Sequence, residues 1–282
     1  MLGRDRIQYK SLDQVRLMRV AGLLVADALD AVRAQLRPGV STKELDAVAE
    51  DVIRGAGGTP SFVGYQGYPA TLCISVNDEV VHGIPGPRVL EAGDLVSVDC
   101  GAIVAGWHGD SAFSAIVQGG QAAASGQACA TAHDDADLVA VTEQAMWHGI
   151  AAIAAGERLN AIGAAVEDFV AGRYGLVEEY GGHGIGTQMH QDPHVLNYRT
   201  RDKGPRMKPG LCLAIEPMLT AGDPSTRVLA DDWTVVTQDG RRAAHWEHSA
   251  ALHDGGLWVL TARDGGEAGL AAVGVRFAPL GD

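Results

Sequence analysis

The sequence predicts an α+β protein made of two similar halves, and three observations lead to that prediction. The chain has 282 residues, 46% hydrophobic and 20% charged, which is ordinary for a globular protein with an extensive core. Helical periodicity is followed by short apolar runs divided by Gly, Pro and Asn-Asp, and this order occurs twice. A weak internal echo aligns Leu45 with Ile162 and Glu50-Asp51 with Glu167-Asp168. We therefore expect two pseudo-symmetric halves.

The first half is expected to begin with two helices. Apolar residues recur at helical spacing in residues 11–36, where Ser11 can cap the start and Pro38 follows the end. The same pattern returns in residues 42–54 and stops at Gly55. Short apolar runs then predict strands at 71–76, 95–104 and 112–117.

The second half repeats this order. Helices are expected at about 135–155 and 159–174, and strands at 211–215, 233–237, 245–252 and 257–261. Gln238-Asp239-Gly240 predicts a hairpin turn between two of these strands.

The whole chain, 1–282, is expected to be a single catalytic domain. Its N-terminal helices occupy 11–54, the first half runs to about 118 and the second to about 261. The Gly-rich segment 119–127 is the best candidate for a linker, and 262–282, weakly patterned, is expected to be a loosely held tail.

The charge and the termini limit the possible partners and the compartment. A net charge of −13 without a concentrated basic face argues against nucleic-acid binding. No stretch approaches the roughly 20 apolar residues that span a bilayer, and the N-terminus lacks a signal-peptide pattern. The four cysteines show no close pairing or metal-knuckle spacing. We expect a reduced, cytoplasmic protein that does not bind membranes.

Asp99 and Asp110 are the first residues that point to chemistry. Asp99 lies in an apolar run, where burying an unpaired carboxylate is costly. If Ala105-Gly106 turns between two strands, Asp99 lies opposite Ala112, and Asp110 lies on the same face of the sheet. Two such carboxylates repel each other unless a proton or a metal ion lies between them. For this pair alone, two separately satisfied structural aspartates remain an alternative.

Glu216 and Glu247 also end apolar strand-like runs, and His183 lies in Gly181-Gly-His-Gly-Ile-Gly, whose glycines let an ion approach the ring closely. A histidine in such a loop is, taken alone, more often an ordinary loop residue. Four carboxylates and one imidazole suit a pair of oxygen-preferring divalent ions. A water bridging such ions loses a proton near neutral pH and attacks a polarised carbonyl, which is the hydrolysis of amides or phosphate esters.

Six short motifs, in order and at fitting intervals, resemble the type I methionine aminopeptidases of the pita-bread fold. They are Val81-His82-Gly83-Ile84-Pro85, Val98-Asp99, His108-Gly109-Asp110, Gly182-His183-Gly184-Ile185-Gly186, Ile215-Glu216-Pro217-Met218 and Trp246-Glu247-His248. The similarity extends from about residue 11 to 261 and is greatest to short bacterial enzymes of the actinobacterial type. It implies two pseudo-symmetric halves with a central antiparallel sheet covered by helices. It also implies a methionyl aminopeptidase that removes the initiator methionine when the second residue is small.

The resemblance implies a role for each matching residue. Two divalent ions (Co²⁺, Mn²⁺, Fe²⁺ or Zn²⁺) would be held by five ligands: Asp99, Asp110, His183, Glu216 and Glu247. Asp99 would chelate one ion, Asp110 and Glu247 would bridge both, and His183 and Glu216 would complete the shell of the second. Glu216 would also handle the proton of the bridging water.

Further residues would bind the substrate. His190 would stabilise the tetrahedral intermediate and His82 would lie near the scissile amide nitrogen; from the residues alone, both are ordinary loop histidines. Tyr65, Tyr68, Cys73 and Trp233 match the methionine pocket, and an apolar, sulfur-containing wall suits a thioether. Met189, where many relatives carry an aromatic residue, would change the shape of that pocket. From the residues alone, core packing is the favoured explanation of these aromatic residues.

Spacing distinguishes the chain from other enzymes that share these motifs. Glu216 and Glu247 are 31 residues apart, which is too few for the insertion of type II enzymes. Only 81 residues precede His82, which is too few for the N-terminal domain that is expected in prolidases and creatinases. A dipeptidase or Xaa-Pro aminopeptidase, a non-catalytic peptide-binding module and an unrelated di-metal phosphoesterase are the alternatives. The implied partners are nascent polypeptides beginning with Met and the ribosome near its exit tunnel, and a monomer is expected.

Overall fold

The computed structural model describes residues 7–119 and 130–281, and it is built around one large antiparallel sheet. The helices are α1 (Leu12–Gln35), α2 (Thr42–Gly55), α3 (Ala130–Ala155), α4 (Asn160–Val170) and α5 (Glu267–Ala272). The strands of the large sheet are β1 (Thr59–Pro60), β2 (Leu72–Val76), β4 (Leu95–Val104), β5 (Trp107–Ile116), β7 (Gly182–Gly184), β8 (Gln191–Val195), β9 (Cys212–Ile215), β14 (Glu247–His253) and β15 (Gly256–Val259).

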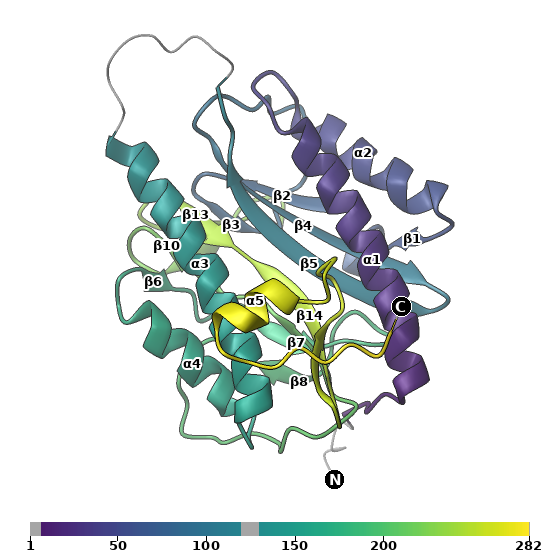
Figure 1. The fold of residues 1–282 in the computed structure, drawn as a ribbon. Coiled ribbons are helices and arrows are strands. Elements are labelled where there is room, and N and C mark those ends of the chain that lie inside the picture. Colours follow the sequence, from purple (N-terminus) through teal and green to yellow (C-terminus); the bar gives the residue numbers. More distant parts are fainter. Residues whose placement is uncertain (1–6, 120–129, 282) are drawn as a thin grey trace.

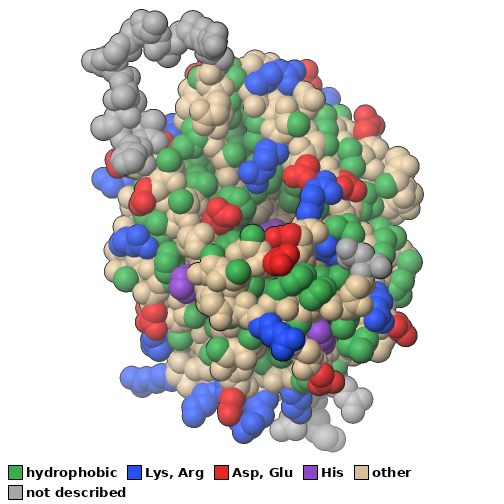
Figure 2. All heavy atoms as spheres, in the orientation of Figure 1, with side chains coloured by type: hydrophobic (Ala, Val, Ile, Leu, Met, Phe, Trp, Pro, Cys, Tyr) green, Lys and Arg blue, Asp and Glu red, His purple; other side chains and the backbone are tan. Residues whose placement is uncertain are grey.

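The main path through this sheet is β1-β4-β5-β14-β9-β7-β8, with β2 beside β4 and β15 beside β14. The four long helices lie on one face of the sheet, α1 and α2 over its first half and α3 and α4 over its second (Figure 1). The expected α+β architecture is thus confirmed. Acidic and basic side chains are interspersed over this helical face (Figure 2).

Two smaller antiparallel sheets complete the structure. One has the order β13-β10-β6, from β6 (Gly175–Leu176), β10 (Met218–Thr220) and β13 (Ala243–His245). The other has the order β11-β12-β3, from β3 (Glu79–Val81), β11 (Thr226–Val228) and β12 (Val235–Thr237). The second therefore joins a strand of the first half to two strands of the second half.

The two N-terminal helices begin where the sequence predicts. Ser11 and Ser41 each accept a hydrogen bond from the backbone N–H three residues on and form a full capping box with Gln14 and Glu44. Apolar residues of both helices pack against β2, β4 and β5 in a single hydrophobic cluster. Where α1 crosses β5 there is no room for a side chain, since a Cβ on Gly109 would lie 2.7 Å from the backbone nitrogen of Gly22.

The β4–β5 hairpin confirms the expected register. Ala105 and Gly106 adopt the left-handed conformation that a two-residue turn requires, with φ of 50° and 80°. Asp99 pairs with Ala112, and Glu247 of β14 pairs with the same alanine from the other side. Because Gly109 faces α1 and side chains alternate along a strand, Asp110 points to the face without helices.

The strongly apolar helix α3 passes the length and composition test for a membrane span over residues 134–155, contrary to the expectation that no stretch approaches one. More than half of that window is buried in the protein, however, against α4 and the strands of the second half. Burial in the core accounts for its apolar composition.

Other expectations for the second half are wrong in detail. Gln238-Asp239-Gly240 lies at a bend, with Gly240 at φ 73°, but makes no hairpin: β12 pairs with β3 and β11, whereas β13 pairs with β10. The predicted strand 245–252 is interrupted at Trp246, because β13 and β14 belong to different sheets. The sequence analysis also missed most strands of two or three residues, which are too short to show periodicity.

Part of the segment after Ala262, which was expected to be a loose tail, packs against α3 and β15. Leu270 of α5 is fully buried, and a Cβ on Gly269 would lie 2.3 Å from the Trp147 ring of α3. The Ala278 N–H then donates to Leu257 O of β15 at 2.9 Å. Leucine and aromatic side chains thus anchor a segment whose many glycines obscure any pattern. The expected linker 119–127, apart from Gly119, lies outside the described residues.

Candidate active site

A cavity of about 360 Å³ opens on the face of the sheet opposite the helices, and all twelve residues singled out from the sequence line it. Five of them are Asp99, Asp110, His183, Glu216 and Glu247, which come from five consecutive strands of the sheet: β4, β5, β7, β9 and β14. Glu216 follows the last residue of β9 directly, and the other four lie within their strands. Residues up to 148 positions apart in sequence, 247 less 99, thus share one floor.

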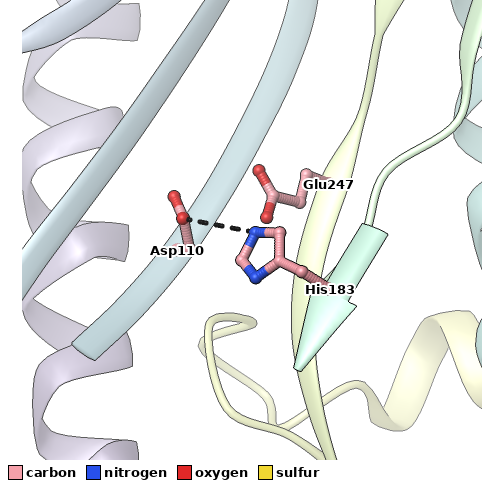
Figure 3. Close-up of side chains that lie close together, drawn as sticks. All are labelled: Asp110, His183 and Glu247. Carbon is pink, nitrogen blue, oxygen red and sulfur yellow. Dashed lines mark ion pairs between the residues drawn. The ribbon is translucent and has the colours of Figure 1, made fainter. Parts of the chain in front are cut away.

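The side chains of Asp110, His183 and Glu247 converge (Figure 3). One ligand-type atom from each lies within 4.8 Å of the other two. His183 Nε2 lies 3.9 Å from Asp110 Oδ2 and 3.5 Å from Glu216 Oε1. These spacings are too long for good hydrogen bonds and leave the lone pairs of several atoms directed at a common space.

The orientation of His183 is fixed by its own backbone. Its Nδ1 lies 3.0 Å from Gly184 O, and because a carbonyl only accepts, Nδ1 carries the hydrogen. Nε2 therefore presents a lone pair to the carboxylates, which is the tautomer of a metal-binding histidine.

The glycines beside His183 serve strand packing. A Cβ on Gly182 would lie 2.2 Å from Ala214 O, and one on Gly184 would lie 2.2 Å from Asp192 O. They are needed because neighbouring backbones pass closely, a reason different from the ligand access expected from the sequence.

Burial makes the ionised form of the four carboxylates costly. It raises the pKa of Asp99 to about 7. It also raises the pKa values of Asp110, Glu216 and Glu247 well above the ordinary range, and repulsion between the carboxylates adds to the effect. Among the described residues, no lysine or arginine forms an ion pair with them. Asp99 Oδ1, Asp110 Oδ1 and Glu247 Oε1 are buried without any hydrogen-bond partner in the same set.

Two more histidines line the cavity above these acids. His190 stands edge-on to His183, with ring centroids 4.3 Å apart, and its Nδ1 lies 2.8 Å from the Tyr65 hydroxyl. His82 lies edge-on to Trp233 and has a left-handed backbone, φ 61°, which is uncommon outside glycine. Burial lowers the pKa of His82 to about 4 and also lowers that of His190, so both imidazoles are neutral at pH 7.

One wall of the cavity is apolar. Cys73 on β2 pairs with Asp99 on β4, so the wall begins directly beside the carboxylates. Tyr68 donates its hydroxyl to Leu72 O at 2.9 Å or Gly83 O at 3.0 Å, which turns its ring face inward against Trp233. Met189 is buried in the same cluster. The aromatic residues therefore surround a cavity instead of filling a core.

The comparison with known families agrees with this geometry. The model of metallopeptidase family M24 matches residues 16–254, most of the chain. This chain belongs to metallopeptidase family M24. Its family accounts for the convergent acids, since a metallopeptidase uses a divalent metal and these residues offer oxygen and nitrogen ligands.

Close relatives of this M24 member are bacterial. It is 47% identical over 267 residues to methionine aminopeptidase 1 of Mycobacterium tuberculosis, which covers 92% of this chain and 96% of the relative. It is 44% identical to methionine aminopeptidase 1 of Bacillus subtilis, over 89% of this chain and 98% of that one. The crystal structure of methionine aminopeptidase from Thermotoga maritima superposes with a TM-score of 0.84 at 35% identity, covering 91% of this chain and 99% of that one. The chain thus has the pita-bread fold of the short bacterial form, as expected.

Three residues around the site of this M24 member escaped the sequence analysis. Phe62 and Gln66 line the cavity, and Gln66 has a left-handed φ of 48°. His245 lies buried behind Glu216. Phe62 and Gln66 flank Tyr65 in a loop without periodicity, so only their nearness to that tyrosine pointed to them. His245, two residues before Glu247, was the one with a usable signal: a histidine in an apolar run.

Proposed function

We propose that this protein is a metal-dependent methionyl aminopeptidase that removes the initiator methionine from new proteins. The observation that carries the proposal is that residues of the metal-binding type and an apolar wall line the same cavity. Four buried carboxylates and a correctly oriented imidazole form the floor of a cavity whose adjoining wall suits a thioether. The names of its bacterial relatives support the same activity.

Divalent ions fit this floor. Three carboxylate oxygens are buried without partners, and divalent cations bound beside them would provide partners and return the raised pKa values towards the ordinary range. We propose two ions, which would be held by Asp99, Asp110, His183, Glu216 and Glu247: Asp99 would serve the first, His183 and Glu216 the second, and Asp110 and Glu247 both. The donor set of oxygen and imidazole suits Mn²⁺, Fe²⁺, Co²⁺ or Zn²⁺.

The reaction divides between the ions and the side chains. When bound, the ions supply Lewis acidity, which lowers the pKa of the attacking water and polarises the scissile carbonyl. Glu216, at 12% exposure the most accessible of the three acids nearest His183, takes the proton of that water and passes it towards the leaving amine. Glu216 and the other proposed metal ligands all line the cavity, where the peptide enters.

His190 stabilises the charge that develops on the carbonyl oxygen. When Tyr65 donates its hydroxyl hydrogen to His190 Nδ1, the hydrogen of the neutral ring lies on Nε2. That N–H is then available to the oxyanion. His82 also lines the cavity, and its proposed role is to bind the substrate near the scissile amide nitrogen.

The apolar wall selects methionine as the first residue. Tyr65, Tyr68, Cys73, Met189 and Trp233 surround the space that the thioether would fill. A flexible sulfur-containing side chain packs well against such aromatic and sulfur-containing surfaces. We expect a small second residue, as the family resemblance implies.

Because ligands come from both sides of residue 119, we infer that the chain acts as one catalytic domain. We also propose that it works as a monomer in the cytoplasm, on nascent chains near the ribosomal exit tunnel.

Release of free methionine from Met-Gly-Met-Met and Met-Leu-Met-Met tests the proposal, with Mn²⁺ or Co²⁺ added and with chelator. We expect metal-dependent cleavage of the first peptide and little cleavage of the second. Absence of cleavage by folded protein with either metal would contradict the activity. Equal cleavage of both peptides would contradict only the preference for a small second residue.

A further inference from the structure

His245 is a buried imidazole that the proposed mechanism leaves unused. It is the last residue of β13 and only 1% exposed. Its Nε2 is buried without a hydrogen-bond partner among the described residues, and Glu216 Oε2 lies 3.7 Å away. A buried polar nitrogen without a partner costs free energy, so its retention beside a carboxylate calls for a reason.

The backbone fixes where this ring points. The His245 N–H donates to Ser114 Oγ at 2.9 Å, and the same hydroxyl donates to His245 O at 2.8 Å. Ser114 lies on β5, four residues beyond Asp110, and its Oγ also lies 2.8 Å from Ser97 Oγ on β4. The position of His245 is therefore tied to the hairpin that carries Asp99 and Asp110.

Glu216 stands between two imidazoles that offer different groups. His183, 3.5 Å from Oε1, has its hydrogen on Nδ1 and presents a lone pair. Oε1 and His183 Nε2 are therefore both electron donors, directed at the space for a cation. On the opposite side Oε2 faces His245 Nε2, and a carboxylate oxygen can only accept. The favourable tautomer of His245 thus carries its hydrogen on Nε2.

We infer that His245 is a positioning residue: its Nε2–H, 3.7 Å from Glu216 Oε2 in this structure, closes to a hydrogen bond when a divalent cation is bound and so holds the Glu216 carboxylate in place. The inference rests on the proposed metal site. Such outer partners orient metal-binding groups, and their loss typically weakens metal affinity by about 10- to 100-fold.

Three substitutions separate positioning from packing. Gln places an amide N–H close to where His Nε2 lies, Asn has an amide too short to reach, and Leu fills the space without a donor. His253→Leu is the matched control, since His253 is also buried but bonds to Ala278 O at 2.6 Å, away from the site.

The first measurement is Mn²⁺ affinity by titration calorimetry on chelator-treated protein, followed by kcat and KM. We expect His245→Leu and His245→Asn to weaken Mn²⁺ binding by about 10- to 100-fold. His245→Gln should retain most of the affinity, and His253→Leu should leave it unchanged. Melting of the chelated protein shows how far each variant is destabilised without metal.

Equal Mn²⁺ affinity in wild type and His245→Leu would overturn the inference and leave the metal site standing. Equal losses in the Gln and Leu variants would also overturn it, because a packing role does not depend on the donor. If His245→Leu fails to fold, the contrast between Gln and Asn decides. No Mn²⁺ binding by wild type would overturn the metal site itself and this inference with it.

Discussion

The two halves of the molecule supply one site in different ways. The first half presents Asp99 and Asp110 on the hairpin β4–β5, whose ten-residue strands pair along their whole length. The second half presents His183, Glu216 and Glu247 in or just beyond strands of three, four and seven residues. Regular pairing fixes the position of a side chain through register, whereas the residues on short strands depend on packing around them. The first arrangement can be recognised from sequence, and the second needs the folded chain.

Removing one of the two proposed bridging acids from each half is the strongest test of this comparison. Asp110→Ala and Glu247→Ala should each lower kcat/KM by about 10³-fold or more, because each acid is proposed to bind both ions and its loss would cost several kcal/mol of transition-state stabilisation. Metal content after dialysis should fall in both variants. Asp168→Ala, which removes an exposed ion pair with Arg199, is the control. Near-full turnover with both ions bound in either variant would remove that residue from the site.

His190→Ala should have the next largest effect and should separate catalysis from metal binding. Its N–H is proposed to act on the developing oxyanion, so kcat should fall by roughly 10²- to 10³-fold with metal content unchanged. Tyr65→Phe removes only the hydroxyl that orients His190 and should cost less. Steady-state kinetics with measured metal content checks both variants, and unchanged turnover in His190→Ala would exclude His190 from the mechanism.

Asp99→Asn should increase the stability of the metal-free protein at neutral pH while it impairs metal binding. The pKa of Asp99 is raised from 3.8 to about 7 in the fold, so between these values the folded state holds a proton that the unfolded state has lost. Wild-type stability therefore falls, relative to the variant, as pH rises from about 4 to 7. The difference above pH 7 should be on the order of a few kcal/mol. Urea unfolding of chelated protein at pH 5 and pH 8 measures it, and an equal difference at both values would contradict the assignment.

Ser41→Ala should have the smallest effect and should sharpen the contrast between the helices of the two halves. Ser41 and Glu44 form a capping box on α2, whereas Leu159, at the N-cap position of α4, provides no side-chain cap. We expect a loss of about 1 kcal/mol in unfolding free energy, seen as a lower urea midpoint. Ser41→Gly should cost less than Ser41→Ala, since Gly is itself a tolerated N-cap. A midpoint equal to wild type would show that packing alone holds α2 in place.

Much of the site could be predicted because its chemistry is local in the sequence. An acid in an apolar run, such as Asp99 in 95–101, already signals a buried charge. His183 carried a weaker signal, and the glycines around it proved to serve strand packing. Phe62 and Gln66 were missed because they lie in a loop without periodicity, and His245 was missed because the apolar run around it does not show that it lies behind Glu216. The break at Trp246 was missed because the apolar pattern continues through it while the hydrogen-bond partners change.

By itself the sequence predicted the four long helices, the cap at Ser11 and the register of the β4–β5 hairpin, and it pointed to the candidate ligand residues. Each of these depends on interactions between residues close along the chain, or on a period that matches a strand or helix. Only the tertiary structure decided that Asp99, Asp110, Glu247, Glu216 and His183 occupy five consecutive strands, that the final segment packs on α3, and that His245 lies behind Glu216. Those arrangements depend on which strands pair across the two halves, and pairing between distant strands is chosen by packing of the whole core.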